Sequence, residues 1–208
     1  MSSLDYRALS KIDAESALTF QPLLFEKIWT NLDVSNPVRI LDFGAVQPVS
    51  MDFYSNSEVP CFITITDCLE TLIGLQKNDE DETVKLKNII DELFPDDVEP
   101  YDVILLWECF NYLDPAVFPL LNQKIKQLSH KKSLLYGYLH TSKYTTNYTC
   151  EFKINSESSF SCSEKLDKSI KPEVINALKL KKYMPDFEIS RSVLIRNGLQ
   201  EFIMQLTK

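Results

Sequence analysis

The spacing of apolar residues along the chain predicts a protein that contains both strands and helices. Short continuous apolar runs are typical of strands that are buried on both faces of a parallel sheet. We expect such strands at Arg39–Phe43, Phe62–Thr66, Val103–Trp107 and Ser133–Leu139. Apolar residues that recur every three to four positions predict helices at Leu4–Ala17, Phe20–Leu32, Pro48–Tyr54, Leu69–Gln76, Thr83–Phe94, Pro115–His130 and Lys171–Tyr183.

The end of the chain has a different pattern. Phe187–Ile195 alternates between apolar and polar residues, Asn197-Gly198 is a tight-turn pair, and Glu201–Leu206 is a second run. This predicts two antiparallel strands, although most doubly wound sheets end on a helix or a parallel strand. The overall prediction is a three-layer α/β/α sandwich with a Rossmann-like, mostly parallel sheet ending in an antiparallel β-hairpin.

Two stretches are less regular. Residues 141–169 are rich in Ser, Thr, Tyr and Asn, and we expect a loop or a loose hairpin there, with Tyr148–Ile154 against Ser159–Glu164. No clear strand follows the acidic patch Asp79–Glu82, so an edge strand of the sheet is expected to be short or missing. The length of 208 residues favours a single domain, 1–208, with an N-terminal helical layer at 1–36 and a loop or lid insertion at 141–170.

Charge and composition narrow the function classes. The net charge is −8, and it is uneven: residues 1–102 carry 7 basic and 20 acidic side chains, whereas residues 124–208 carry 15 basic and 8 acidic ones. The uneven charge has two interpretations. The two halves can pair by charge with a protein partner or a second subunit, or the charged side chains can simply lie on faces exposed to solvent. An acidic total argues against nucleic-acid binding because phosphates are repelled.

The cysteines and the apolar segments of the sequence indicate the cellular compartment in which the protein is expected. Five cysteines without a closely spaced pair indicate reduced thiols and no zinc site: Cys61, Cys68, Cys109, Cys150 and Cys162. The N-terminus lacks an apolar signal region, and no apolar run approaches the ~20 residues that a bilayer requires. We therefore expect a cytoplasmic protein without a membrane partner.

The stretch Val38–Asp67 has the outline of a nucleotide-binding βαβ unit. A strand ends at Gly44, a short helix follows, and a second strand ends at Asp67. Gly44 allows a sharp turn close to a ligand, and the carboxylate of Asp67 can accept hydrogen bonds from two ribose hydroxyls. Asp67 can equally be the N-cap of the helix that follows it.

With these residues the chain resembles the class I S-adenosylmethionine-dependent methyltransferases, from about Val38 to Leu206. The resemblance rests on Ile40–Gly44, the acid Asp67, the strand Val103–Trp107 and the terminal hairpin. More narrowly, the segment Trp107–Leu113 is similar to the Trp-acid-x-x-Asn-Tyr-Leu pattern of a bacterial methyltransferase-like group.

The resemblance implies S-adenosylmethionine as cofactor and a set of residues that contact it: Asp42, Gly44, Asp67, Cys68, Trp107 and Glu108. Phe43 and Trp107 are further candidates to flank the adenine, although aromatics at strand ends usually belong to the core. The catalytic residues remain open. The candidates lie after the strands that end at Trp107 and Leu139: Glu108, Asn111 and His140.

The chain departs from the family in its glycine loop. The family pattern is an acid followed by three alternating glycines, and here Val46 and Pro48 stand where the second and third glycines belong. We expect Val46 to fill space near the methionine end of the cofactor, and Pro48 removes one amide donor.

Two function classes therefore follow from the sequence. The first is an S-adenosylmethionine-dependent methyltransferase acting on a small molecule or a protein, and this is the leading interpretation. The second is a catalytically inactive protein of the same fold. It either binds a protein partner, which can be a second copy of the chain in a homodimer, or senses the cofactor without chemistry. Fold alone does not choose between them.

Overall fold

A computed structural model describes residues 18–75, 82–94, 99–141, 149–165, 172–195 and 199–207. The predicted helix Leu4–Ala17 and the Asn197-Gly198 turn lie outside these ranges. The strands are β1 (Leu18–Phe20), β2 (Val38–Asp42), β3 (Cys61–Ile65), β4 (Tyr101–Trp107), β5 (Ser129–His140), β6 (Thr149–Ser156), β7 (Ser159–Lys165), β8 (Phe187–Leu194) and β9 (Leu199–Leu206). The helices are α1 (Phe25–Trp29), α2 (Pro48–Asn56), α3 (Leu69–Gly74), α4 (Glu82–Leu93), the 3₁₀ helix η2 (Cys109–Tyr112), α5 (Phe118–Gln127) and α6 (Ala177–Tyr183).

The main sheet has the strand order β3-β2-β4-β5-β9-β8. The first four strands are parallel to one another, and β9 pairs antiparallel with both β5 and β8. This confirms the predicted Rossmann-like sheet and the antiparallel pairing at its end. Within the described residues no strand lies between α3 and α4, so β3 is an outer strand of the sheet.

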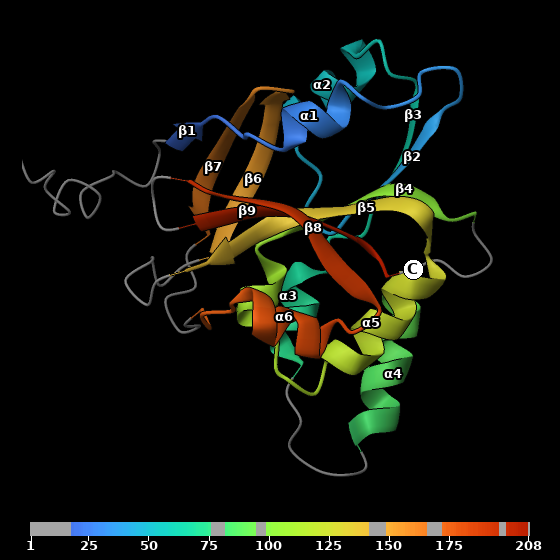
Figure 1. The fold of residues 1–208 in the computed structure, drawn as a ribbon, viewed down its shortest axis with the longest axis vertical. Coiled ribbons are helices and arrows are strands. Elements are labelled where there is room, and N and C mark those ends of the chain that lie inside the picture. Colours follow the sequence, from blue (N-terminus) through green and yellow to red (C-terminus); the bar gives the residue numbers. More distant parts are fainter. Residues whose placement is uncertain are drawn as a thin grey trace, which may run out of the picture.

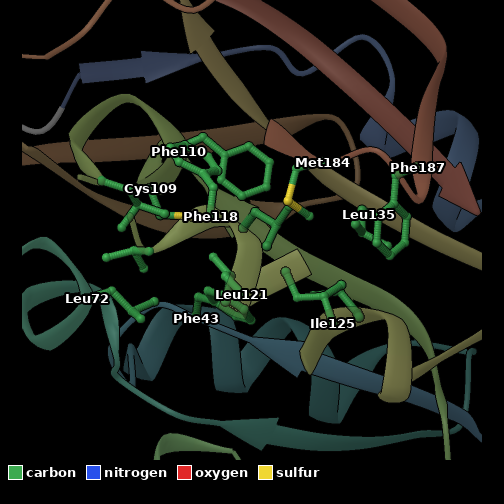
Figure 2. Packing of buried hydrophobic residues seen from close by; sticks show 14 of the residues in the cluster. Phe43, Leu72, Cys109, Phe110, Phe118, Leu121, Ile125, Leu135, Met184 and Phe187 are labelled. Carbon is green, nitrogen blue, oxygen red and sulfur yellow. The ribbon is translucent and has the colours of Figure 1, made fainter. Parts of the chain in front are cut away.

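Helices cover both faces of this sheet. Figure 1 shows α3, α4, α5 and α6 below the sheet and α1 and α2 above it. Each side has its own cluster of buried side chains. The strand β4 lies between the two clusters, which explains its unbroken apolar run. Figure 2 shows the lower cluster, where Phe43 and Leu72 meet Cys109 and Phe118.

A separate three-stranded sheet has the order β1-β7-β6. The β6–β7 hairpin forms where the sequence favoured a loop or a loose hairpin, with Phe152 opposite Cys162 and Ile154 opposite Phe160. β1 adds to it because Phe20 packs edge-on against Tyr138, Phe152 and Phe160. In Figure 1 this sheet lies at the same side of the main sheet as α1 and α2.

Three predicted helix starts were wrong. The helix expected over Phe20–Leu32 is only α1, because Phe20 belongs to β1. The helix expected from Pro115 begins at Phe118, since Pro119 has no amide hydrogen and must lie in the first turn. The helix expected from Lys171 begins at Ala177, where the Asn176 side chain accepts a hydrogen bond from the Lys179 amide at 2.9 Å.

The other helix predictions agree with the structure to within a few residues. Pro48 occupies the first turn of α2, as predicted. The C-terminal end expected at His130 was too late, because β5 already begins at Ser129. None of the helices in the described ranges is long and apolar enough to span a membrane.

Candidate functional site

The candidate site lies where the order of the parallel strands reverses, between β2 and β4. β2 has β3 on one side and β4 on the other, so a crevice is expected outside the carboxyl ends of β2 and β4. Gly44 follows β2, and Trp107 is the last residue of β4. The contents of this crevice decide what the fold can bind.

The indole ring of Trp107 occupies the space over Gly44. A Cβ atom placed on Gly44 would lie 2.9 Å from Trp107 Nε1 and 3.3 Å from Cδ1. Trp107 Nε1 donates a hydrogen bond of 2.6 Å to Asp42 Oδ1, and the Gly44 amide donates one of 2.8 Å to the same oxygen. The backbone approach that glycine permits is therefore used by an indole ring of the chain itself.

Among the described residues, the hydrogen-bond partners of the buried Asp42 carboxylate include no cation. Burial raises the pKa of Asp42 to about 6, although the bonds from Trp107 and Gly44 oppose the rise. Because Oδ1 already accepts both of these donors, Asp42 acts as the acceptor that fixes the indole ring.

The backbone of Trp107 is held in an unusual conformation. Its φ is 52°, in the left-handed region that bulky residues rarely adopt. The pairing of β4 with β5 shifts register between Leu105 and Trp107, and a Cβ on Gly137 would lie 2.4 Å from the Trp107 carbonyl oxygen. Glycine at position 137 is thus required for this carbonyl to approach β5.

The β6–β7 hairpin covers the indole ring. Phe152 stacks on Trp107 with centroids 5.0 Å apart and an interplanar angle of 9°, and it also stacks on Tyr138 at 5.3 Å and 7°. Phe160 contacts Trp107 edge-on at 5.8 Å. Trp107 is consequently 4% exposed.

Glu108 and His140, two of the sequence candidates, lie together, and both are buried. Glu108 Oε2 lies 2.9 Å from His140 Nε2, and Oε1 accepts a short hydrogen bond from the Cys150 amide of β6. Within the described part of the chain, His140 Nδ1 has no hydrogen-bond partner. The pair therefore ties the start of the hairpin to the end of β5.

Asn111 is also buried and holds a different segment. Its side-chain amide donates to the Glu173 carbonyl at 2.7 Å, and its own carbonyl accepts from the Glu173 amide at 2.6 Å. Asn111 Oδ1 has no partner among the described residues. The structure thus places Asn111 in a structural contact with the segment before α6.

Asp67 and Cys68 differ strongly in exposure. Asp67 is exposed at the end of β3 with φ 45°, and its amide donates to the Gly44 carbonyl at 3.2 Å. It is not the N-cap of α3: that position is Cys68, which makes no capping bond. Cys68 is fully buried, and burial raises the pKa of its thiol to about 12.

The structure also shows where Val46 and Phe43 lie. Val46 is 63% exposed, and the atoms nearest to a Cβ on Gly44 belong to Trp107 and Asp42. Phe43 is buried in the lower cluster with its ring 5.0 Å from that of Phe94, so it belongs to the core, the alternative that the sequence left open.

The sequence reasoning missed three residues that shape this region. Phe152 lies in the stretch that was expected to be irregular, and no sequence signal distinguishes it. Gly137 could have been noticed, since an isolated glycine in a strand indicates close backbone approach. Glu201 is a lone acid in the apolar run of β9, and it is fully buried.

Among the described residues, no cluster of His, Cys, Asp and Glu could hold a metal ion.

Comparison with known proteins gives a likeness in structure only. No protein-family model matches the chain, and no curated protein matches it in sequence. Among solved structures, it is similar to the 1,6-didemethyltoxoflavin-N1-methyltransferase of Burkholderia thailandensis, which was solved with 1,6-didemethyltoxoflavin and S-adenosylhomocysteine. The identity is 15%, the TM-score is 0.50, and the match covers 89% of this chain and 77% of that one.

A second similar structure is an S-adenosylmethionine-dependent methyltransferase from Bacteroides fragilis in complex with S-adenosylhomocysteine. The identity is 13%, the TM-score is 0.47, and the match covers 99% of this chain and 83% of that one. At such identities, the match to the Burkholderia enzyme shows a shared fold and leaves the activity to be argued from the residues of this chain.

Proposed function

We propose that this chain, which has the fold of the class I S-adenosylmethionine-dependent methyltransferases, is a non-catalytic member that binds a protein partner. The observation that carries the proposal is the position of the Trp107 indole ring in the space over Gly44. The residues present do not fit the methionine end of S-adenosylmethionine there.

The steric conflict is supported by the contacts that hold the ring. The Asp42 carboxylate, the left-handed backbone of Trp107 and the stacked ring of Phe152 all favour one orientation of the indole. Moving the ring would break a buried hydrogen bond to a carboxylate, worth about 1.5–3 kcal/mol, and would separate two stacked aromatic rings. A ligand would have to supply this free energy before it gained any affinity.

The hydrogen-bonding groups of the crevice support the same conclusion. The Gly44 amide already donates to Asp42, and Pro48 at the start of α2 has no amide hydrogen. Glu108, Asn111 and His140 are buried in contacts that fasten other segments. Two backbone positions of the loop, Gly44 and Pro48, therefore have no free amide to offer to a ligand carboxylate.

A working methyltransferase acting on a small molecule is the second candidate, and Asp67 favours it. Its carboxylate is exposed at the carboxyl end of β3, where a ribose could be held. Methyl transfer depends mainly on alignment, so the lack of an obvious base does not exclude it. This candidate requires that Trp107 and the β6–β7 hairpin move aside.

Calorimetry of the purified protein with S-adenosylmethionine and with S-adenosylhomocysteine separates the two candidates. We expect no binding tighter than about 1 mM, since the ring excludes the ligand. A dissociation constant in the micromolar range for either ligand would overturn the proposal and favour the methyltransferase.

The variant Trp107→Ala tests the cause. It should gain affinity for S-adenosylhomocysteine, whereas the control Trp29→Ala, which removes another buried tryptophan in α1, should not. If Trp107→Ala does not fold, the variant Trp29→Phe leaves Trp107 as the single tryptophan, whose emission can be excited apart from that of the tyrosines. Its emission should then be unchanged by millimolar ligand, and a shift on titration would contradict the proposal.

A further inference from the structure

The outer strand β3 is apolar but poorly covered. Its sequence is Cys-Phe-Ile-Thr-Ile, and none of these residues is buried, whereas four of the five residues of its neighbour β2 are buried. Phe62 is 62% exposed. Among the described strands, β3 pairs with β2 alone.

Within the described residues, one edge of β3 presents backbone groups without a hydrogen-bond partner. The Pro60 carbonyl accepts from the Val38 amide at 2.8 Å, and the Thr66 amide donates to the Asp42 carbonyl at 2.9 Å. Because strand groups alternate, Phe62 and Thr64 point their backbone groups toward β2, and Cys61, Ile63 and Ile65 point theirs outward. No backbone hydrogen bond from another described residue reaches these outward groups.

The other outer strand, β8, is protected in ways that β3 is not. β8 has exposed charges at Glu188 and Arg191, and its pairing with β9 is irregular between Ile189 and Arg191. Charges and bulges are the usual protection of a sheet edge against further pairing. β3 is uncharged, contains no proline and pairs with β2 in an uninterrupted register.

The surroundings of β3 are acidic at both ends. Glu58 lies before the strand and Asp67 after it; both are exposed, and within the described part of the chain neither forms an ion pair. The basic residue on the neighbouring strand is Arg39, which lies opposite Phe62. Its side chain already contacts Glu99: Nε donates to the Glu99 carbonyl at 3.2 Å, and Nη1 lies 3.8 Å from the Glu99 carboxylate. A strand with basic residues at its ends would complement this edge.

We propose that β3 accepts an extended segment of a partner protein as an added strand, with an apolar or β-branched centre and a basic residue beyond each end. The inference names the partner class for the binding role proposed above and rests on it. Main-chain hydrogen bonds to Cys61, Ile63 and Ile65 provide the pairing, and Phe62 packs against a side chain of the added strand. The carboxylates of Glu58 and Asp67 attract the basic residues at the two ends of the added strand and so favour it over a strand with acidic ends.

The test uses a fluorescein-labelled peptide, Lys-Lys-Val-Thr-Val-Thr-Val-Lys-Lys, and the same core with Glu at the four flanking positions. Fluorescence anisotropy with the full chain should show binding of the basic peptide and at least tenfold weaker binding of the acidic one. Phe62→Lys should weaken binding of the basic peptide about tenfold, because it adds a like charge to the edge. Leu194→Lys, a substitution of an exposed residue on β8, is the matched control and should leave binding unchanged.

Amide hydrogen exchange locates the peptide. Exchange at Cys61, Ile63 and Ile65 should slow on binding, and exchange along β8 should not. The double variant Glu58→Lys, Asp67→Lys should reverse the preference toward the acidic peptide.

Several results would overturn the inference. These are no binding of the basic peptide, equal weakening by Phe62→Lys and Leu194→Lys, or protection on β8. Sedimentation that shows a dimer abolished by Phe62→Lys would assign the edge to a second copy of this chain and would also overturn it. None of these measurements involves S-adenosylmethionine, so failure here is distinct from failure of the calorimetric test.

Discussion

At the residue scale, the contacts of Asp42 in the structure differ from the role that the sequence suggested for it. The sequence suggested that Asp42, at the end of the first parallel strand, contacts a cofactor through water or a loop amide, or else caps the next helix. In the structure it accepts from Trp107 Nε1 and from the Gly44 amide with a single oxygen. A buried carboxylate with two donors and no cation is costly, and this cost depends on pH.

The pH dependence of stability should therefore differ between the wild type and Asp42→Asn. The folded-state pKa of about 6 lies above the ordinary aspartate pKa of 3.8, so the folded state binds more protons between these values. The free energy of unfolding contributed by Asp42 is then larger at low pH and is lost as pH rises through about 6. Between pH 7.5 and pH 4.5 the wild type should gain about 2 kcal/mol relative to Asp42→Asn, measured by urea unfolding.

The comparison with Asn cancels the contributions of other titrating groups. Asp33 and Asp186 have lowered pKa values because of their hydrogen bonds, and they act in the opposite direction in both proteins. A constant difference between wild type and Asp42→Asn across this pH range would mean that Asp42 is already ionised at pH 4.5.

At the scale of elements, the end of β4 and the β6–β7 hairpin form one unit. The register shift between β4 and β5 turns Trp107 into the crevice, and Phe152 of β6 closes over it. Ser50 of α2 and Glu108 after β4 each accept a backbone amide of β6, from Ile154 at 2.9 Å and from Cys150. The hairpin is thus fastened to α2, to Trp107 at the end of β4 and to Glu108 after it.

Gly137 is the position where this unit is most sensitive. The variant Gly137→Ala should lower the free energy of unfolding by about 1–3 kcal/mol, because its Cβ would collide with the Trp107 carbonyl, a backbone atom that cannot rotate away. Chemical denaturation measures this loss, and near-ultraviolet circular dichroism should report a changed environment of Trp107.

Gly74→Ala provides the matched control. Gly74 is the last residue of α3, and a Cβ there would have no atom within 4 Å. This variant should be neutral or stabilise the protein by up to about 1 kcal/mol, since alanine restricts the unfolded chain. An equal loss of stability in both variants would show that the Gly137 contact is not the cause.

At the scale of the whole molecule, Glu201 joins the two ends of the described chain. From β9 its Oε1 accepts from the amides of Leu24 at 2.8 Å and Phe25 at 3.1 Å and from the Tyr136 hydroxyl at 2.7 Å; Oε2 accepts from the Leu23 amide at 2.8 Å. These amides precede or begin α1. One carboxylate therefore fixes where α1 starts and holds the N-terminal segment on the sheet.

Glu201→Gln should destabilise the protein by about 1–3 kcal/mol, because the new amide group presents a donor to a backbone donor in a buried place. Amide exchange at Leu23, Leu24 and Phe25 should increase more than exchange in the central strand β4. The exposed residue Glu188 offers the control: Glu188→Gln should change stability by less than about 0.5 kcal/mol. Unchanged exchange at Leu23–Phe25 in Glu201→Gln would mean that other contacts hold α1.

The strands of the main sheet could be predicted from the sequence alone, although β5 begins earlier than expected. The unbroken run Val103–Trp107 can be satisfied only between two covered faces, and the alternation of Phe187–Ile195 with the run Glu201–Leu206 predicted the antiparallel end. Pro48 marked the start of α2 for a local reason, its missing amide hydrogen. These features follow from neighbours a few residues apart, which is why pattern alone finds them.

Only the tertiary structure decided what fills the crevice. Trp107 meets Gly44, Gly137 and Phe152 from three other parts of the chain, and Glu201 meets Leu24 across 177 positions of sequence. The same long-range contacts set where α1 begins and draw β1 onto β7. The spacing of apolar residues predicts which side of an element is buried, but it does not identify the distant side chain that packs there. That packing determines whether the loop after β2 is open to a ligand.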